Sequence, residues 1–296
     1  MTKSSYLAGV LFTLFSALFW GISATAGQYL FEYKDIDPKW LTTTRLFCSG
    51  FVLFIIVFKK KKEKVFIIFT NKSDTLTLLF YSIIGLFLCQ YTYYLTIELS
   101  NAAIATILQY TSPAFIVLYI AFVGKKSPTK VEILALFLVI GGAFVLATHL
   151  NPNSLSIPLK ALIFGLISAL CIVVYSITPL NINKKYGILT CLSLGLMISG
   201  VLSFFINKFW LYGSVSDLSG FFAVFCVVFF GTILSFSFFM KGLSILGPTK
   251  TSLIAAVEPV AAALFIYIFL GERYVFLDFI GFFMILSATF ILIKKG

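Results

Sequence analysis

The sequence predicts an all-α, polytopic membrane protein of ten transmembrane helices, formed by two inverted five-helix repeats around a central cavity. Three observations lead to this prediction: the composition, the division of the chain into apolar stretches joined by short loops, and an internal repeat. Of the 296 residues, 60% are hydrophobic and 11% are charged. A soluble domain is about 45–50% apolar and about 25% charged. The apolar residues therefore exceed what a soluble core can bury, and lipid is the solvent that suits them.

A helix needs about 20 mainly apolar residues to cross a bilayer, and the chain has room for roughly ten such helices. The stretch 6–31 is too long for the apolar part of a cleaved signal peptide, so we expect it to be a retained span. The lysine-rich stretch 59–74 is predicted to be a loop. The ten spans are placed at about residues 6–31, 39–58, 75–97, 102–123, 131–148, 159–180, 187–207, 219–243, 248–270 and 275–293.

The positive charge of the chain predicts its orientation. The formal net charge is +11, and the basic residues lie mainly in short loops between apolar stretches, which is a topology signal and not the mark of a nucleic-acid-binding protein. With the N-terminus inside, 16 of the 22 lysines and arginines fall on the inner side. We therefore expect a plasma-membrane protein with both termini in the cytoplasm.

An internal repeat relates the two halves of the chain, residues 1–150 and 151–296. A shift of 146 residues places Gly85 on Gly231 and Pro113 on Pro259, and similar shifts match Ser49-Gly50 with Ser199-Gly200. Because each half contains an odd number of spans, the second half enters the membrane from the opposite side. Inverted repeats are typical of secondary transporters, whose sites lie near mid-membrane between the halves. A duplication that only enlarged the bundle is the alternative.

Glu258 is the strongest candidate for a functional residue. The stretch 248–270 is predicted to be one helix, with Glu258-Pro259 near its middle. A carboxylate at that depth is costly and marks a functional site by default. Because hydrocarbon favours the neutral form of a carboxyl group, Glu258 is a candidate for proton coupling. A structural brace at the Pro259 kink is the alternative.

Further polar and aromatic residues lie on shared helix faces and could line the cavity. An aromatic wall with a few polar groups suits amphipathic or zwitterionic solutes, although each residue taken alone could serve packing instead. Lys241 could also extend to the inner interface. Arg45 and Glu98 both fall toward the outer face and are candidates for an outer gate. The cavity-lining candidates are Trp20, Gln90, Tyr94, Gln109, Ser112, Tyr175 and Lys241.

The sequence gives no sign of a metal site, a cofactor or a catalytic centre. The five cysteines lie in apolar stretches without CxxC spacing, and His149 is the only histidine. A disulfide framework and a histidine-based metal site are therefore not expected. There is no HExxH motif and no acid that could pair with Glu258 near mid-membrane, so we do not expect an enzyme.

The chain resembles the ten-span EamA-type exporters of the drug/metabolite transporter superfamily over essentially its whole length. The first half departs from the pattern, since Asn101-Ala102 stands in place of Gly-Pro and Gly124-Lys125-Lys126 in place of Gly-Glu-Arg. The two halves are therefore not expected to contribute equally to the site. The motifs that carry the resemblance are Phe19-Trp20-Gly21, Pro38 with Arg45, Gly247-Pro248, Glu258-Pro259, Gly271-Glu272-Arg273 and Gly281.

This resemblance implies a secondary-active transporter that moves small organic metabolites, such as amino acids or related amphipathic compounds. We expect export by alternating access, with protons as a candidate coupling ion and with the solute and the lipid bilayer as partners. The alternatives are an importer, a multidrug or quaternary-cation carrier of the same fold, and a membrane assembly protein that transports nothing. Membership of so broad a family names neither the substrate nor the oligomeric state.

Overall fold

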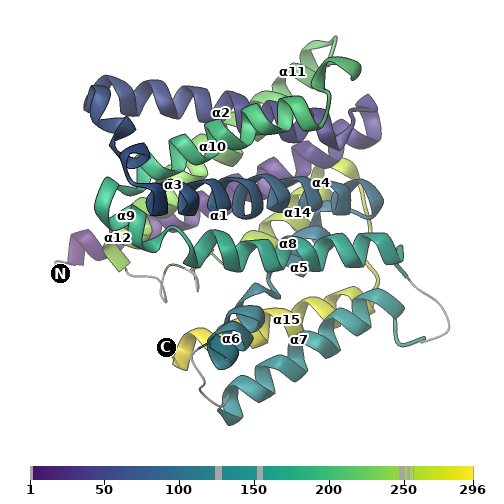
Figure 1. Ribbon diagram of the computed structural model, residues 1–296. Helices are drawn as coiled ribbons and strands as arrows, with labels where there is room; N and C mark the ends of the chain where they lie inside the picture. The colour runs from purple at the N-terminus through teal and green to yellow at the C-terminus, as the bar shows by residue number, and fades with distance from the viewer. Residues whose placement is uncertain are drawn as a thin grey trace.

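The computed structural model describes residues 3–123, 129–151, 156–246, 251, 254–255 and 257–295, and within these residues the chain is a bundle of helices without strands (Figure 1). The first half contains α1 (Lys3–Lys34), α2 (Pro38–Lys61), η1 (Lys62–Thr70), α3 (Lys72–Phe80), η2 (Tyr81–Leu88), α4 (Cys89–Leu99), α5 (Ala102–Gln109), α6 (Ser112–Val123) and α7 (Lys130–Thr148). The second half contains α8 (Leu159–Ile177), α9 (Leu180–Tyr186), α10 (Ile188–Ile206), η3 (Phe209–Leu211), α11 (Leu218–Phe225), η4 (Cys226–Leu234), α12 (Ser235–Leu246), α14 (Glu258–Leu270) and α15 (Phe276–Lys295).

Apolar helices occupy the positions of the predicted spans. Among the residues that the structure describes, six helical stretches are long and apolar enough to cross a membrane, and four shorter apolar helices lie at the places of the other expected spans. Large side chains such as Phe269, Phe276 and Phe283 are more than 70% exposed on the bundle surface, as expected where a helix faces lipid. The all-α polytopic fold is therefore confirmed, whereas the number of ten crossings stays a prediction.

The lysine-rich stretch 59–74 is helical, so the expectation of a loop there was wrong. Helix α2 continues to Lys61, and the 3-10 helix η1 follows it directly. Lysine is a good helix former. In addition, Val65 and Ile68 are buried to 1% and 0% exposure, and their spacing of three residues puts them on one face of a 3-10 helix. Burial of that face holds the segment against the bundle.

Two of the predicted spans are broken near their middle. Helix α5 ends at Gln109 and α6 begins at Ser112, while α14 begins at Glu258. Ser112 and Glu258 are equivalent in the repeat, and a proline follows each of them, in the first turn, where its missing N–H costs no hydrogen bond. Glu258 therefore starts a helix and does not stand in the middle of one. The motif residues Gly247-Pro248 and Gly124-Lys125-Lys126 lie outside the described part of the chain.

Two π-helical stretches also occur at equivalent positions. The stretch η2 covers Tyr81–Leu88, and η4 covers Cys226–Leu234, which is the same register after the shift of 146 residues. Each contains one of the repeated glycines, Gly85 or Gly231. A π-helical turn inside an α-helix is rare and is often found at a functional site.

The packing of the helices is reciprocal between the halves. Figure 1 shows α2 beside α10 along one edge of the bundle and α7 beside α15 along the opposite edge. A Cβ added at Gly50 would lie 2.6 Å from the Met197 backbone nitrogen, and one at Gly200 would lie 2.5 Å from the Phe47 Cα. The shift that matches Gly50 with Gly200 also matches Phe47 with Met197. Mutual contacts of this kind are what a twofold relation produces.

Hydrogen bonds to the π-helical stretches show the same reciprocity. The Ser49 hydroxyl donates to the Val228 carbonyl at 3.2 Å, and the Ser199 hydroxyl donates to the Ser82 carbonyl at 2.7 Å. The two serine donors, Ser49 and Ser199, are matched by a shift of about 150 residues, and so are the two acceptors, Ser82 and Val228. The contacts are thus reciprocal, whereas the inverted repeat with its division near residue 150 stays a prediction.

We expect Gly200→Ala to destabilise the protein by roughly 1–3 kcal/mol, the usual cost of overpacking, because the added methyl group would meet the Phe47 backbone, which cannot rotate away. Gly213→Ala is the matched control, since a Cβ there has no neighbour within 4 Å. Unfolding of the purified variants in detergent, followed by tryptophan fluorescence, measures the effect. Equal stability of the two variants would contradict the tight contact between α2 and α10.

Candidate functional site

A cavity of about 220 Å³ lies inside the bundle, between elements of both halves. Its walls come from α1, α2, η2, α4, α5 and α6 of the first half and from α8, α12 and α14 of the second. Both helix breaks open onto it, through Tyr110 and Ser112 on one side and Ala255 and Glu258 on the other. The cavity therefore lies where the backbone of the bundle is least regular.

Most of the residues singled out in the sequence lie on the wall of this cavity. Tyr94 lies just behind the wall, fully buried. Lys241 is exposed, with its ammonium 5.1 Å from the centre of the Phe12 ring, and Glu98 is exposed in the last turn of α4. Neither Lys241 nor Glu98 is part of the cavity wall. The predicted residues on the wall are Trp20, Arg45, Gln90, Gln109, Ser112, Tyr175 and Glu258.

Tyr110 connects the two helix breaks and was not singled out in the sequence. Its hydroxyl lies 2.6 Å from the Ala255 carbonyl oxygen and 3.2 Å from Glu258 Oε2. The Ala255 carbonyl belongs to the turn just before α14, so Tyr110 bonds both the loosened backbone and the carboxyl group. An unbroken helix over 102–123 would turn Tyr110 away from the face of Gln109 and Ser112. The proline that follows Ser112 was the available signal for the break.

Gln109 is fixed against the opposite half of the bundle. Its side-chain nitrogen donates to the Ser168 hydroxyl at 2.7 Å, and that hydroxyl donates to the Cys89 carbonyl at 2.9 Å. The chain of bonds joins α5, α8 and the start of α4. Gln109 therefore has a defined position on the cavity wall.

Arg45 lies deeper in the bundle than the sequence suggested, and its role with Glu98 in an outer gate stays a prediction. Helix α2 begins at Pro38, so Arg45 lies about two turns, roughly 10 Å, inside the bundle, and it is only 4% exposed. Arg45 and Glu98 form no ion pair in the structure. The guanidinium donates instead to the Thr232 hydroxyl at 2.8 Å, the Tyr94 hydroxyl at 3.0 Å and the Gly231 carbonyl at 2.9 Å.

The cavity holds one cationic and one acidic side chain. Arg45 and Glu258 both line it and interact electrostatically. A buried charge is costly unless another charge or hydrogen bonds compensate it. Arg45 donates hydrogen bonds to three acceptors, whereas Glu258 accepts one hydrogen bond, from Tyr110, among the described residues. Glu258 is therefore the less completely compensated of the two and has capacity to bind a further group.

Aromatic rings form a large part of the remaining wall. The Trp20 ring lies 5.4 Å from the Phe236 ring and 5.3 Å from the Phe239 ring, and Tyr175 lies 6.2 Å from Phe236. These separations are typical of packed aromatic pairs. The result is an apolar surface that ends in a few polar groups, the usual composition of a site for a small organic molecule.

A helical bundle with a polar and aromatic cavity between its halves, bordered by broken helices, is typical of a membrane transport protein. The chain belongs to the EamA-like transporter family, whose model matches residues 7–148 and 159–294. The predicted resemblance to EamA-type transporters is thereby confirmed.

Two relatives and one solved structure are similar to this chain. A protein of Salmonella typhimurium (strain LT2), named an uncharacterized inner membrane transporter, YicL, is 35% identical over 96% of this chain and 94% of its own length. An uncharacterized transporter of Archaeoglobus fulgidus is 26% identical over 69% of this chain and 72% of its own. A crystal structure whose title names no function has a TM-score of 0.65 at 17% identity, covering 99% of this chain and 98% of the other. It shows the fold alone.

We expect Arg45→Lys to destabilise the protein by roughly 1.5–3 kcal/mol, the contribution of a hydrogen bond to a charged group. A lysine keeps the charge but lacks the planar fork that reaches three acceptors. Arg273→Lys is the matched control, since that arginine is exposed. Thermal unfolding in detergent compares the two variants, and a loss of similar size in both would argue against the role of the three bonds.

Proposed function

We propose that this membrane transporter is a secondary-active exporter of small organic metabolites, such as amino acids or related amphipathic compounds, and that it works by alternating access. The observation that carries the proposal is the cavity between the halves, where Glu258, Arg45 and two helix starts converge. A solute with both an amino and a carboxyl group matches these features. The carboxylate of Glu258 would bind the ammonium group of such a solute.

The start of α6 suits a carboxylate. An α-helix carries a positive partial charge at its N-terminus, from backbone N–H groups that have no partner within the helix. The first turn of α6 contains no acidic residue that would occupy this position, whereas α14 begins with Glu258. The two helix starts therefore differ in charge, and each can bind the opposite end of a zwitterion.

The size of the cavity favours small metabolites over bulky drugs. Its volume is about 220 Å³, below the roughly 300–1,000 Å³ of sites for drug-sized ligands. A multidrug or quaternary-cation carrier is therefore the less favoured alternative. An importer would use the same cavity, because direction is set by the driving gradient and not by the site.

Contacts at the end of the bundle opposite the termini would have to part for the cavity to open there. Gln28 on α1 donates to Glu272 at 2.7 Å and accepts from the Ala102 backbone N–H at 2.9 Å. Lys34 forms an ion pair with Asp217 at 2.7 Å, which lowers the pKa of that carboxyl to about 2. Both sets of contacts join α1 to other parts of the chain. We place this end outside and both termini in the cytoplasm.

Proton coupling through Glu258 follows from its position in the cavity and its single hydrogen-bond donor. We expect Glu258→Gln to retain the fold and solute binding but to lose the dependence of transport on a pH gradient, because an amide does not titrate. The measurement is the uptake of radiolabelled solute into liposomes with and without an imposed pH gradient. Gradient dependence equal to that of the wild type would rule out the proton role of Glu258.

Tyr110 is proposed to position Glu258. We expect Tyr110→Phe to reduce the transport rate about 10-fold or more, as a loss of 1.4 kcal/mol or more in a step that depends on this contact would produce, and to shift the pH profile of transport. Tyr119→Phe is the matched control, since Tyr119 is 43% exposed on α6. A normal rate with an unchanged pH profile would show that Tyr110 serves only packing.

The class of transported solute can be tested directly. Purified protein in liposomes would be given a panel of radiolabelled amino acids and cationic dyes, with and without a pH gradient. Saturable flux of an amino acid supports the proposal, and flux of dyes alone supports the multidrug alternative. Absence of saturable flux for every compound would favour an assembly protein that transports nothing.

A further inference from the structure

A second, strongly basic cleft shares no lining residue with the central cavity. Figure 1 shows α9, which forms part of it, at the end of the bundle where the N-terminus is marked. The volume of the cleft is about 1000 Å³, and it lies between the end of α2, η1 and the end of α9. Five lysines line it, against a single acidic residue, Glu63. They are Lys60, Lys61, Lys62, Lys64 and Lys185.

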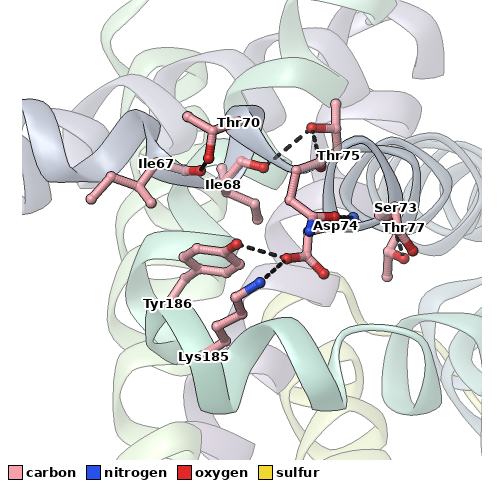
Figure 2. A network of polar contacts seen from close by, with 10 residues as sticks. Ile67, Ile68, Thr70, Ser73, Asp74, Thr75, Thr77, Lys185 and Tyr186 are labelled. Carbon is pink, nitrogen blue, oxygen red and sulfur yellow. Dashed lines mark hydrogen bonds and ion pairs between the residues drawn. The ribbon is translucent and has the colours of Figure 1, made fainter.

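Two of these lysines hold the walls of the cleft together. The Lys61 ammonium donates to the Tyr186 carbonyl at 2.8 Å and to the Thr190 hydroxyl at 2.9 Å. Lys185 pairs with Asp74 at 2.5 Å, and the Tyr186 hydroxyl donates to the same carboxylate at 2.6 Å, as Figure 2 shows. These bonds fix α9 against α2 and α3. The cleft therefore has walls that do not depend on a ligand.

The other three lysines outnumber the one carboxylate of the cleft, Glu63. Within the described part of the chain, Lys60, Lys62 and Lys64 form no ion pair with an acidic side chain. Lys62 also has a φ of +50°, a backbone conformation that L residues seldom adopt. Such a turn persists only where the surrounding packing imposes it. Lys60, Lys62 and Lys64 line one cleft on both sides of this turn, and an anion bound there would reduce the repulsion between their like charges.

The 3-10 geometry of η1 divides its side chains among three faces. Val65 and Ile68 are buried in the bundle. Lys64 and Ile67 form a second face, and both line the cleft. The third face carries Phe66 and Phe69, 46% and 42% exposed.

The aromatic face of η1 continues an apolar surface of α2. The Phe66 ring lies 6.0 Å from the Phe54 ring and 6.2 Å from the Phe58 ring. Phe58 is 39% exposed near the end of this predicted span, at the level where hydrocarbon meets the headgroups. The basic cleft thus adjoins a surface suited to acyl chains.

We propose that this cleft binds the phosphate-bearing headgroup of an anionic lipid, with the acyl chains lying along Phe66 and Phe58. A basic pocket beside transmembrane helices is a known form of anionic-headgroup site. The apolar face next to the lysines distinguishes a lipid from a soluble phosphate compound, which would use the ammonium groups alone. This site is independent of the proposed transport function.

The test uses the full-length protein in detergent, titrated with phosphatidylglycerol, with phosphatidylcholine or with soluble glycerol phosphate, and native mass spectrometry of the bound lipid. Each lysine near an anionic surface contributes roughly fivefold in affinity. We therefore expect the triple variant K60Q/K62Q/K64Q to bind phosphatidylglycerol about 100-fold more weakly than the wild type. The variant K60R/K62R/K64R keeps the charges and should bind normally.

The matched control is K72Q/K130Q/K184Q, which removes the same charge from exposed lysines on the same predicted side that do not line the cleft. We expect its affinity for phosphatidylglycerol to stay close to that of the wild type. An equal loss in this control, or equally tight binding of phosphatidylcholine, would overturn the proposal. Glycerol phosphate that binds as tightly as the lipid and displaces it would show a site for soluble anions instead.

Discussion

The rest of this structure depends on one constraint: a chain inside hydrocarbon must satisfy its own backbone polar groups. An unbroken α-helix does so, but the helix breaks before α6 and α14 and the π-helical stretches η2 and η4 leave the backbone less regularly bonded. Side chains donate hydrogen bonds to the backbone carbonyls at these places. Arg45 binds the Gly231 carbonyl, and Tyr110 binds the Ala255 carbonyl. Two polar residues of the cavity wall, Arg45 and Tyr110, thus also bond the irregular backbone.

The same principle explains why the two halves resemble each other in detail. The Ser16 hydroxyl donates to the Ser235 carbonyl at 2.9 Å, and the Ser168 hydroxyl donates to the Cys89 carbonyl at 2.9 Å. Each carbonyl directly follows a π-helical stretch, and each serine comes from the first helix of the other half. The departure from this resemblance is at the helix breaks, where Ser112 is the counterpart of Glu258. The polarity of the cavity therefore comes from one half more than from the other.

The sequence predicted the apolar helices and the family, because the hydropathy pattern and the motifs can be read directly from the order of the residues. Helical stripes also indicated Trp20, Gln109 and Tyr175, which the structure places on the cavity. The depth of Arg45 was not predicted, because a hydropathy boundary does not show how deeply a helix end is inserted. The break at Tyr110 was missed because proline fixes only its own vicinity, while the exact start of the following helix depends on contacts from distant parts of the chain.

The π-helical stretches have a consequence for the direction of the side chains that follow them. An α-helix turns by about 100° for each residue, whereas a π-helical turn holds more residues and turns by less for each of them. Gln90 and Tyr93 follow η2, and Phe236 and Phe239 follow η4, and all four line the cavity. An ordinary α-helix with the same number of residues would turn further over either stretch and would point these side chains in another direction. The winding of each stretch is thus as much a part of the cavity as the residues that line it.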